Sequence, residues 1–165
     1  MIGPHIKALL LEGQDDFLIP AENVATVLYS HPLEHALLLL SNIRYSKIPV
    51  LDTSDHLVGL ISLADIANKM MGVEHFDSVL LDGMTVADVM EVDVASVHSS
   101  DDLEDILHLL VDAPFLPAID DDDIFCGIIT RKEILKAVNH LVHDLERRYE
   151  LIEKEIVKQD EQIKN

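Results

Sequence analysis

The chain of 165 residues contains one sequence pattern twice. Residues 48–66, IPVLDTSDHLVGLISLADI, align without a gap to residues 116–134, LPAIDDDDIFCGIITRKEI. Upstream, residues 24–40 align in the same order to residues 94–110, and the second copy lacks two residues between these blocks. A repeat of this length predicts two copies of one supersecondary unit, which stack because neither buries its apolar face alone.

Each copy is predicted to fold as a β-α-β-β-α unit. In the first copy, an apolar run over 24–27 indicates a strand, and apolar residues at helical spacing indicate a helix over 33–44. The apolar runs 48–51 and 57–61 are joined by four polar residues, which is typical of a β-hairpin. A second helix begins at Ser62. The equivalent elements of the second copy are predicted over 94–97, 103–111, 116–119 and 125–129, and from Thr130.

Both second helices begin with a capping pattern. Ser62 is followed three residues later by Asp65, and Thr130 by Glu133. A hydroxyl N-cap with an acidic residue at this spacing forms a capping box, which explains these residues without any ligand. The start of a helix also presents free amides and a positive dipole end, which attract anions. A structural and a binding role are therefore both open at these positions.

The apolar pattern of the last helix continues beyond the second copy. Apolar residues recur at helical spacing from Ile134 through Leu145 to Ile156, about four turns past the repeated unit. An apolar stripe of this length needs a partner, which is either another subunit or a protein target. Self-association is the interpretation we favour.

The charge and the cysteine content exclude several classes of protein. The chain has 12 Lys and Arg residues against 31 Asp and Glu residues, a net charge of −19. Binding to nucleic acid or to an anionic membrane requires a basic face, so neither is expected. Cys126 is the single cysteine, so no disulfide framework is expected, and a reducing cytoplasm is the expected location. No apolar run approaches the length of a membrane span, and the first residues do not read as a signal peptide.

The four consecutive aspartates 120–123 are the most conspicuous candidate for a metal site. Contiguous aspartates in a short turn cannot all face one ion, and the first copy has Thr53 and Ser54 at the two middle positions. Aspartate is common in turns because its side chain accepts hydrogen bonds from nearby amides. We therefore expect a solvated turn and no metal site. No catalytic triad order, glycine-rich phosphate loop or isolated carboxylate pair points to an enzyme.

The repeated unit resembles the CBS domain. The resemblance is carried by the Gly-hydrophobic-hydrophobic-Ser/Thr-x-x-acid ending of each copy, and by Thr-Val-Ala-Asp-Val-Met at 85–90, a short helix that commonly precedes a CBS copy. It implies an α+β fold in which two CBS units pack as a pseudo-twofold disc, the Bateman module, with an extended C-terminal helix. The expected divisions are an N-terminal helical segment at 1–13, CBS units at 14–75 and 84–140, and a C-terminal helical extension at 141–165.

The resemblance also implies a ligand cleft between the copies. In Bateman modules, the first strand and hairpin entry of one copy meet the Ser/Thr-x-x-acid helix start of the other. Arg131 and Lys132 stand where the first copy has Leu63 and Ala64, and they are either phosphate ligands or solvated surface cations. Tyr45 would stack on a purine or close the end of its helix. The residues expected in this cleft are Asn23, Val24, Ala25, Arg44, Tyr45, Ser46, Lys47, Ile48, Pro49, Thr130, Arg131, Lys132 and Glu133.

A second cleft is implied on the opposite side. It would combine Ser62 and Asp65 with Val94, Ala95 and Phe115. It has no nearby cation, so we expect it to bind weakly or to stay empty.

The pattern Tyr-Ser-x-Ile-Pro at 45–49 and Thr-Arg-Lys at 130–132 is similar to small stand-alone CBS proteins of Gram-positive bacteria that bind cyclic di-AMP. The resemblance implies a homodimer and a regulatory ligand, with no cofactor. The nucleotide-free form would engage a (p)ppGpp synthetase or a metabolic enzyme, and bound nucleotide would block that contact. Asn23 stands where that group has a basic residue, which favours AMP or ATP as the alternative ligand. A ligand-free adaptor acting through the C-terminal helix is the alternative from another class.

Overall fold

A computed structural model of the chain describes all residues except 1, 12–16, 44, 72–80, 99 and 151–165. The two sequence copies form two units, called unit 1 and unit 2. Unit 1 consists of β2 (Val27–Leu28), α2 (Leu33–Asn42), β3 (Lys47–Leu51), β4 (Leu57–Ser62) and α3 (Leu63–Met70). Unit 2 consists of β5 (Val97–His98), α4 (Leu103–Asp112), β6 (Phe115–Ile119), β7 (Phe125–Thr130) and α5 (Arg131–Arg148). The predicted β-α-β-β-α order of both copies, and with it the α+β class, is confirmed.

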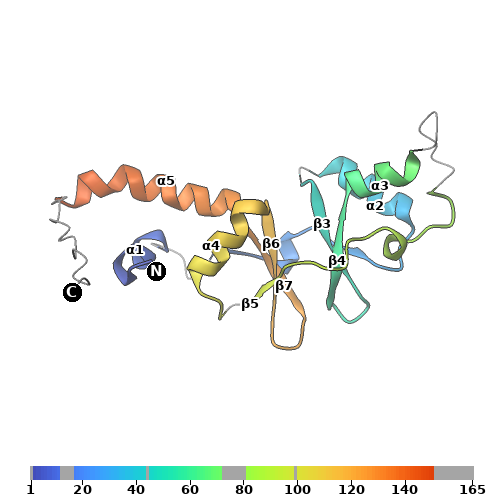
Figure 1. Ribbon diagram of the computed structural model, residues 1–165, viewed down its shortest axis with the longest axis horizontal. Coiled ribbons are helices and arrows are strands. Elements are labelled where there is room, and N and C mark those ends of the chain that lie inside the picture. Colours follow the sequence, from blue (N-terminus) through green and yellow to red (C-terminus); the bar gives the residue numbers. More distant parts are fainter. Residues whose placement is uncertain (1, 12–16, 44, 72–80, 99, 151–165) are drawn as a thin grey trace, which may run out of the picture.

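The units lie side by side along the long axis of the molecule, and both hairpins point to the same side (Figure 1). Helix α5 extends away from unit 1, and α1 (Pro4–Leu10) lies beside it. Each unit has its own sheet: β2-β3-β4 in unit 1, and β1-β7-β6-β5 in unit 2. In both sheets the short first strand of the unit runs parallel to its neighbour, and the hairpin strands are antiparallel.

Each sheet is completed by backbone that precedes the other unit in the sequence. Strand β1 (Leu18–Pro20), which precedes unit 1, pairs antiparallel with β7 of unit 2. Glu91, which precedes unit 2, exchanges backbone hydrogen bonds of 2.9 and 2.8 Å with Leu60 of unit 1. This exchange interlocks the units, so neither sheet is complete without the chain that leads into the other unit.

Two equivalent glycines permit this close pairing. A Cβ atom on Gly59 would lie 2.5 Å from the carbonyl oxygen of Glu91, and one on Gly127 would overlap the carbonyl oxygen of Ile19. Gly127 also has a φ of 151°, a conformation that side chains rarely adopt. Both glycines therefore mark a close approach of backbone, which a side chain would block.

Three apolar clusters form the core. One lies between the helices and sheet of unit 1, and one occupies the equivalent place in unit 2. The third lies between the sheets, with Leu51 and Leu60 from unit 1 and Phe115, Phe125 and Ile128 from unit 2. Burial of this third cluster holds the units against each other, because all five side chains are removed from water.

The first strand of each unit lies later in the chain than predicted. Val24 and Ala25 precede β2, because the 3-10 helix Ala21–Asn23 ends with a bond of 3.1 Å from Val24 N to the carbonyl of Ala21. Only Val27 and Leu28 pair with β3, so the strand prediction for 24–26 was wrong. The prediction for 94–96 was wrong in the same way, because only Val97 and His98 pair with β6.

The C-terminal helix has a different end from the predicted one. The predicted helical pattern ran to Ile156, whereas α5 ends at Arg148 and Tyr149 is extended, with φ −131° and ψ 143°. The predicted helical positions from 151 onward lie outside the described residues.

Candidate functional site

The acidic residues in the first turns of α3 and α5, Asp65 and Glu133, make different contacts. Asp65 closes a full capping box: its carboxylate accepts bonds from the backbone N–H and the hydroxyl of Ser62, at 2.9 and 2.5 Å. Thr130 Oγ1 accepts from the backbone N–H of Glu133 at 3.2 Å, while the carboxylate of Glu133 pairs with Lys136 at 2.6 Å. The start of α5 is therefore capped from one side only, and its acid is neutralised by a neighbouring lysine.

Arg131 is bound to the end of the preceding helix. Its Nε donates to the carbonyl of Leu110 at 2.8 Å, and its Nη2 donates to the carbonyls of Val111 and Ala113, both at 3.0 Å. A cation is favoured there, because the last carbonyls of a helix carry the negative end of its dipole. The sequence left Arg131 open as a phosphate ligand or a solvated surface cation. The structure gives one edge of this guanidinium a structural role at α4.

Lys132 is the cation at this helix start whose ammonium has no partner among the described residues. It lies in an open hollow of about 520 Å³ at the junction of α4 and α5. The hollow is lined by Pro114, Arg131, Lys132, Leu135, Lys136 and Asn139. None of the residues predicted from unit 1 lines it.

The side chains of the residues predicted from the hairpin entry of unit 1 differ in their exposure to solvent. Tyr45 and Ser46 are exposed and able to meet a ligand, whereas Ile48 and Pro49 are buried and offer only backbone groups. The ammonium of Lys47 is paired with the carboxylate of Glu91 at 2.5 Å. In the pairing of β3 with β4, Lys47 lies opposite Ser62. Arg44 lies outside the described residues.

Three of the other predicted residues meet at the core between the sheets, whereas Ala25 packs against the core of unit 1. Val24 and Val94 occupy equivalent places there and pack against the same cluster as Phe115. Asn23 and Ala25 lie on either side of Val24, and Ala95 is exposed beside Val94. Among the described residues, no hydrogen bond or ion pair joins the helix start 130–133 to 23–25 or to 45–49.

Phe115 distinguishes the two predicted clefts. It occupies the position in unit 2 that Lys47 occupies in unit 1, lies opposite Thr130 across the hairpin, and is only 5% exposed. A buried aromatic ring therefore replaces a charged side chain at one of the two pseudo-equivalent places. The two pseudo-equivalent places therefore differ in charge, and the expected difference in what the clefts bind stays a prediction.

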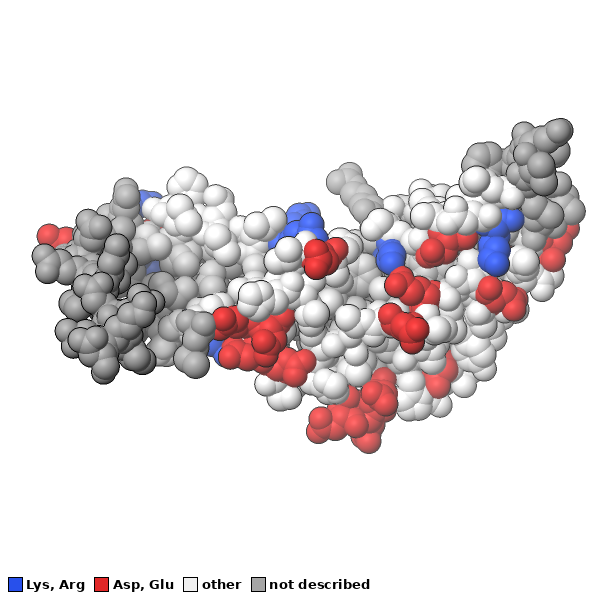
Figure 2. Space-filling view, viewed as in Figure 1, with Lys and Arg blue, Asp and Glu red and all other residues white. Residues whose placement is uncertain are grey.

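Charge is distributed unevenly over the surface. On the face in Figure 2, basic side chains form small separate groups, whereas acidic side chains gather in clusters. Several cations are already paired, among them Lys47 with Glu91 and Lys136 with Glu133. An anionic ligand therefore meets a repelling field over most of the molecule, and a local cation such as Lys132 matters correspondingly more.

The acidic hairpin tips have a defined turn geometry. Asp120 Oδ1 accepts bonds from the amides of Asp122 and Ile124, both at 3.0 Å, and Asp52 Oδ1 does the same for Ser54 and His56. The twin residues Asp55 and Asp123 both have positive φ, 65° and 63°. The predicted turn role of the aspartate run is confirmed at these positions.

Sequence reasoning missed the pairing of the two hairpin tips. Leu57 N donates to the carbonyl of Asp123 at 3.2 Å, and Phe125 N donates to the carbonyl of Asp55 at 2.9 Å.

Beside this junction, His56 Nδ1 lies 2.8 Å from Asp52 Oδ2. The hydrogen bond to Asp52 raises the pKa of His56, and the nearby carboxylates of Asp123 and Asp120 act in the same direction. The available signal was the Asp-x-x-x-His spacing across a turn.

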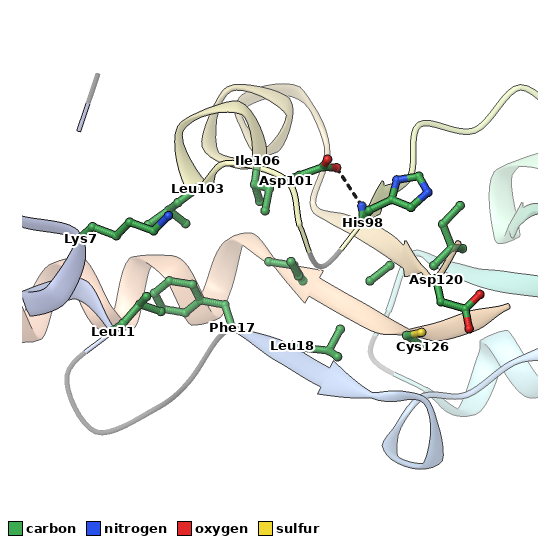
Figure 3. Close-up of a pocket in the computed structure, with 13 residues that line it drawn as sticks. Lys7, Leu11, Phe17, Leu18, His98, Asp101, Leu103, Ile106, Asp120 and Cys126 are labelled. Atoms are coloured by element: carbon green, nitrogen blue, oxygen red, sulfur yellow. Dashed lines mark hydrogen bonds between the residues drawn. The ribbon is translucent and has the colours of Figure 1, made fainter. Parts of the chain in front are cut away.

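A second feature missed from the sequence is an apolar pocket of about 250 Å³ in unit 2 (Figure 3). Leu11 and Phe17 lie on one side of it and Leu103 and Ile106 on another, with Cys126 near Asp120 at one end. Partial burial raises the pKa of the Cys126 thiol, which keeps it neutral.

The repeat explains where this pocket lies. In the core of unit 1, Val50 and Val86 are completely buried. Unit 2 has the smaller Ala118 in place of Val50, and Ala118 lines the pocket. The shortening from valine to alanine was visible in the aligned copies.

Across the described ranges, no group of three or more His, Cys, Asp or Glu side chains is arranged to hold a metal ion. His31 and His35 pack edge to face, with ring centroids 4.9 Å apart. No helix in the described part of the chain combines the length and apolarity that a membrane crossing requires.

Comparison with known proteins identifies relatives over most of the chain. The family model for the CBS domain matches residues 15–72 and 86–140. Cyclic di-AMP receptor B of Bacillus subtilis (strain 168) is 35% identical over 147 residues, covering 89% of this chain and 100% of the relative.

Solved structures agree with this match. A crystal structure of CbpB from Streptococcus agalactiae superposes with a TM-score of 0.79 at 35% identity, covering 93% of this chain and 96% of that one. CbpB of Listeria monocytogenes in complex with c-di-AMP gives a TM-score of 0.73 at 43% identity, covering 78% and 96%. With both repeats matched by the family model and the whole length of a curated relative covered, the chain belongs to the CBS domain family as a tandem pair, the Bateman module.

Proposed function

We propose that this protein is a cyclic di-AMP sensor that binds the nucleotide between its CBS units and thereby controls a partner protein. The observation that carries the proposal is similarity to cyclic di-AMP receptor B over that relative's full length, together with a cationic helix start at Arg131 and Lys132. A dinucleotide has two phosphates. The charge of a phosphate is stabilised by a nearby cation and by the N–H groups at the start of a helix.

The roles of the cleft residues follow from their exposure. Lys132 provides the cation for a phosphate, and its backbone N–H, which lies between the bonded amides of Arg131 and Glu133, adds a hydrogen bond. Tyr45, which is exposed, stacks on an adenine, and backbone groups around Ala25 and Lys47 read its edge. Thr130 and Glu133 lie beside the ribose. Arg131 faces the phosphate with the edge of its guanidinium that α4 leaves unbonded.

AMP or ATP is the second candidate ligand. Asn23 supports AMP, which has a single phosphate, because an amide at this position provides no charge for a second phosphate group; ATP is the alternative that offers the same adenine and ribose. The second cleft, at Ser62 and Asp65, is proposed as the weaker site, since Asp65 is held in its capping box and the buried Phe115 lies where the other cleft has Lys47.

The proposed partner is a (p)ppGpp synthetase or a metabolic enzyme, contacted by a homodimer in the cytoplasm. The nucleotide-free form would make this contact and the bound form would lose it. An adaptor that binds no nucleotide and acts through α5 is the competing function, favoured by the exposed apolar residues of that helix.

Calorimetric titration with cyclic di-AMP, AMP, ADP and ATP tests the proposal. Cyclic di-AMP is expected to bind at micromolar concentration or below, and Lys132→Ala and Arg131→Ala are each expected to weaken binding about tenfold or more, because a charge-assisted bond is lost. Asp121→Ala is the matched control: Asp121 is exposed at the hairpin tip and away from α5.

The outcomes separate the candidates. Tighter binding of AMP or ATP than of cyclic di-AMP would replace the proposed ligand. No binding of any of the four would leave the adaptor. Equal effects of Lys132→Ala and Asp121→Ala would show that the site lies elsewhere.

A further inference from the structure

The side chain of Arg131 connects the start of α5 to the end of α4. Three N–H donors of its guanidinium bond the carbonyls of Leu110, Val111 and Ala113. Its backbone N–H also donates to the carbonyl of Pro114 at 3.0 Å. One residue therefore holds the last turn of α4 against the first turn of α5.

Unit 1 has no equivalent connection in the described residues. Leu63 occupies the place of Arg131 and has no polar side-chain atoms. At the end of α2, Ser41 Oγ and Asn42 Nδ2 both donate to the carbonyl of Leu38, each at 2.8 Å, so that helix is capped by its own last turn. The connection is thus specific to the unit whose helix start carries the cations.

The bonds to α4 leave part of the guanidinium free. Arginine has five N–H donors in a fixed planar fork. Nε uses one on Leu110, and Nη2 uses both of its donors on Val111 and Ala113. The two donors of Nη1 have no partner among the described residues. An anion at the start of α5 can therefore bond Nη1 while the opposite edge stays on α4.

We propose that Arg131 is a positioning residue that couples occupation of the cleft to the order of the last turn of α4. This inference rests on the proposed binding of a nucleotide phosphate at the start of α5. An anion on Nη1 restrains the orientation of the guanidinium, so that less side-chain entropy opposes its bonds to the three carbonyls. The last turn of α4 then frays less in the bound state.

The coupling reaches an exposed apolar surface. Leu109 and Val111, in the last turn of α4, are 42% and 71% exposed. A partner that contacts these side chains would meet a more rigid surface when nucleotide is bound. Because coupling between two sites is reciprocal, such a partner would change the nucleotide affinity by the same factor.

Hydrogen exchange followed by mass spectrometry tests the coupling, with cyclic di-AMP as the probe. In the wild type, saturation with cyclic di-AMP is expected to slow exchange at the end of α4 about fivefold or more, including the amide of Ala113, which bonds Leu109 at 3.2 Å. In Arg131→Lys the charge is kept but the planar fork is lost, so less than a twofold change is expected at equal occupancy. The end of α3, where the amide of Met71 bonds Ala67 at 3.1 Å, lies outside the predicted cleft and is the internal control.

A measurement without nucleotide separates this inference from the proposed function. Arg131→Lys is expected to speed exchange at the end of α4 and to leave the end of α2 unchanged. If cyclic di-AMP binds but protects α4 equally in both proteins, the coupling is disproved and the sensor function stands. If cyclic di-AMP does not bind at all, both proposals fall, even where the ligand-free variant shows faster exchange.

Discussion

The ring of His56 is held by Asp52 at the place where the two hairpins meet. Nδ1 and Oδ2 are 2.8 Å apart, and two further carboxylates, Asp120 and Asp123, raise the pKa of the histidine in the same direction. The hydrogen bond from His56 also lowers the pKa of Asp52. In unit 2 the equivalent of His56 is Ile124, so this charged pair belongs to one hairpin only.

The pair predicts a pH dependence of stability with a definite sign. A raised pKa means that protonated His56 stabilises the folded state; this contribution is complete below about pH 6.5 and is lost as pH rises through the higher folded value. The contribution of Asp52 is present above its usual pKa, near 4, and is lost as pH falls further. Thermal unfolding at pH 6 and pH 8 should therefore show a smaller difference in Tm for His56→Gln than for the wild type.

The control for this measurement is His5→Gln on α1, because His5 is exposed and has no hydrogen bond among the described residues. The His5→Gln variant is expected to show the same difference in Tm between pH 6 and pH 8 as the wild type. A loss of the difference in both variants would mean that the effect comes from overall charge and not from the hairpin pair.

At the scale of elements, one buried position of β3 is occupied by a shorter side chain at its equivalent on β6. Val50 of β3 is completely buried, and its equivalent Ala118 of β6 lines the pocket of about 250 Å³. Ala118→Val is expected to raise the free energy of unfolding by about 1 kcal/mol, because it fills part of this cavity. Val50→Ala should lower it by about 2 kcal/mol, because it opens a cavity in a filled core. Chemical denaturation at constant m-value checks both changes, and a destabilising Ala118→Val would show that the pocket cannot take two more carbons.

The elements show what the sequence could and could not predict. Helices and hairpins followed from local patterns that occur twice, so each copy supported the other. The extra strand β1 was missed because its partner β7 is more than 100 residues away and leaves no local signal. The bonds from Arg131 to α4 were missed for a related reason, because backbone carbonyls are acceptors in every sequence.

At the scale of the whole molecule, α5 carries more apolar surface than its own unit buries. Ile134, Ala137 and Leu141 pack on the core of unit 2, while Leu135 and Val142 on the adjoining strip of the helix are exposed. Because the chain has a net charge of −19, two copies repel each other unless apolar contact offsets the repulsion. The proposed homodimer therefore places these exposed strips against each other.

Replacement of Val142 tests this assembly. Val142→Glu puts a charge into the proposed contact and is expected to shift the protein towards the monomer by tenfold or more in dissociation constant, measured by sedimentation equilibrium. Val92→Glu is the matched control, because Val92 is as exposed as Val142, 63% against 62%, and lies outside α5. Higher salt should favour the wild-type dimer, since screening reduces the repulsion between two acidic chains. Equal weakening by both variants would indicate a general charge effect and would remove α5 from the interface.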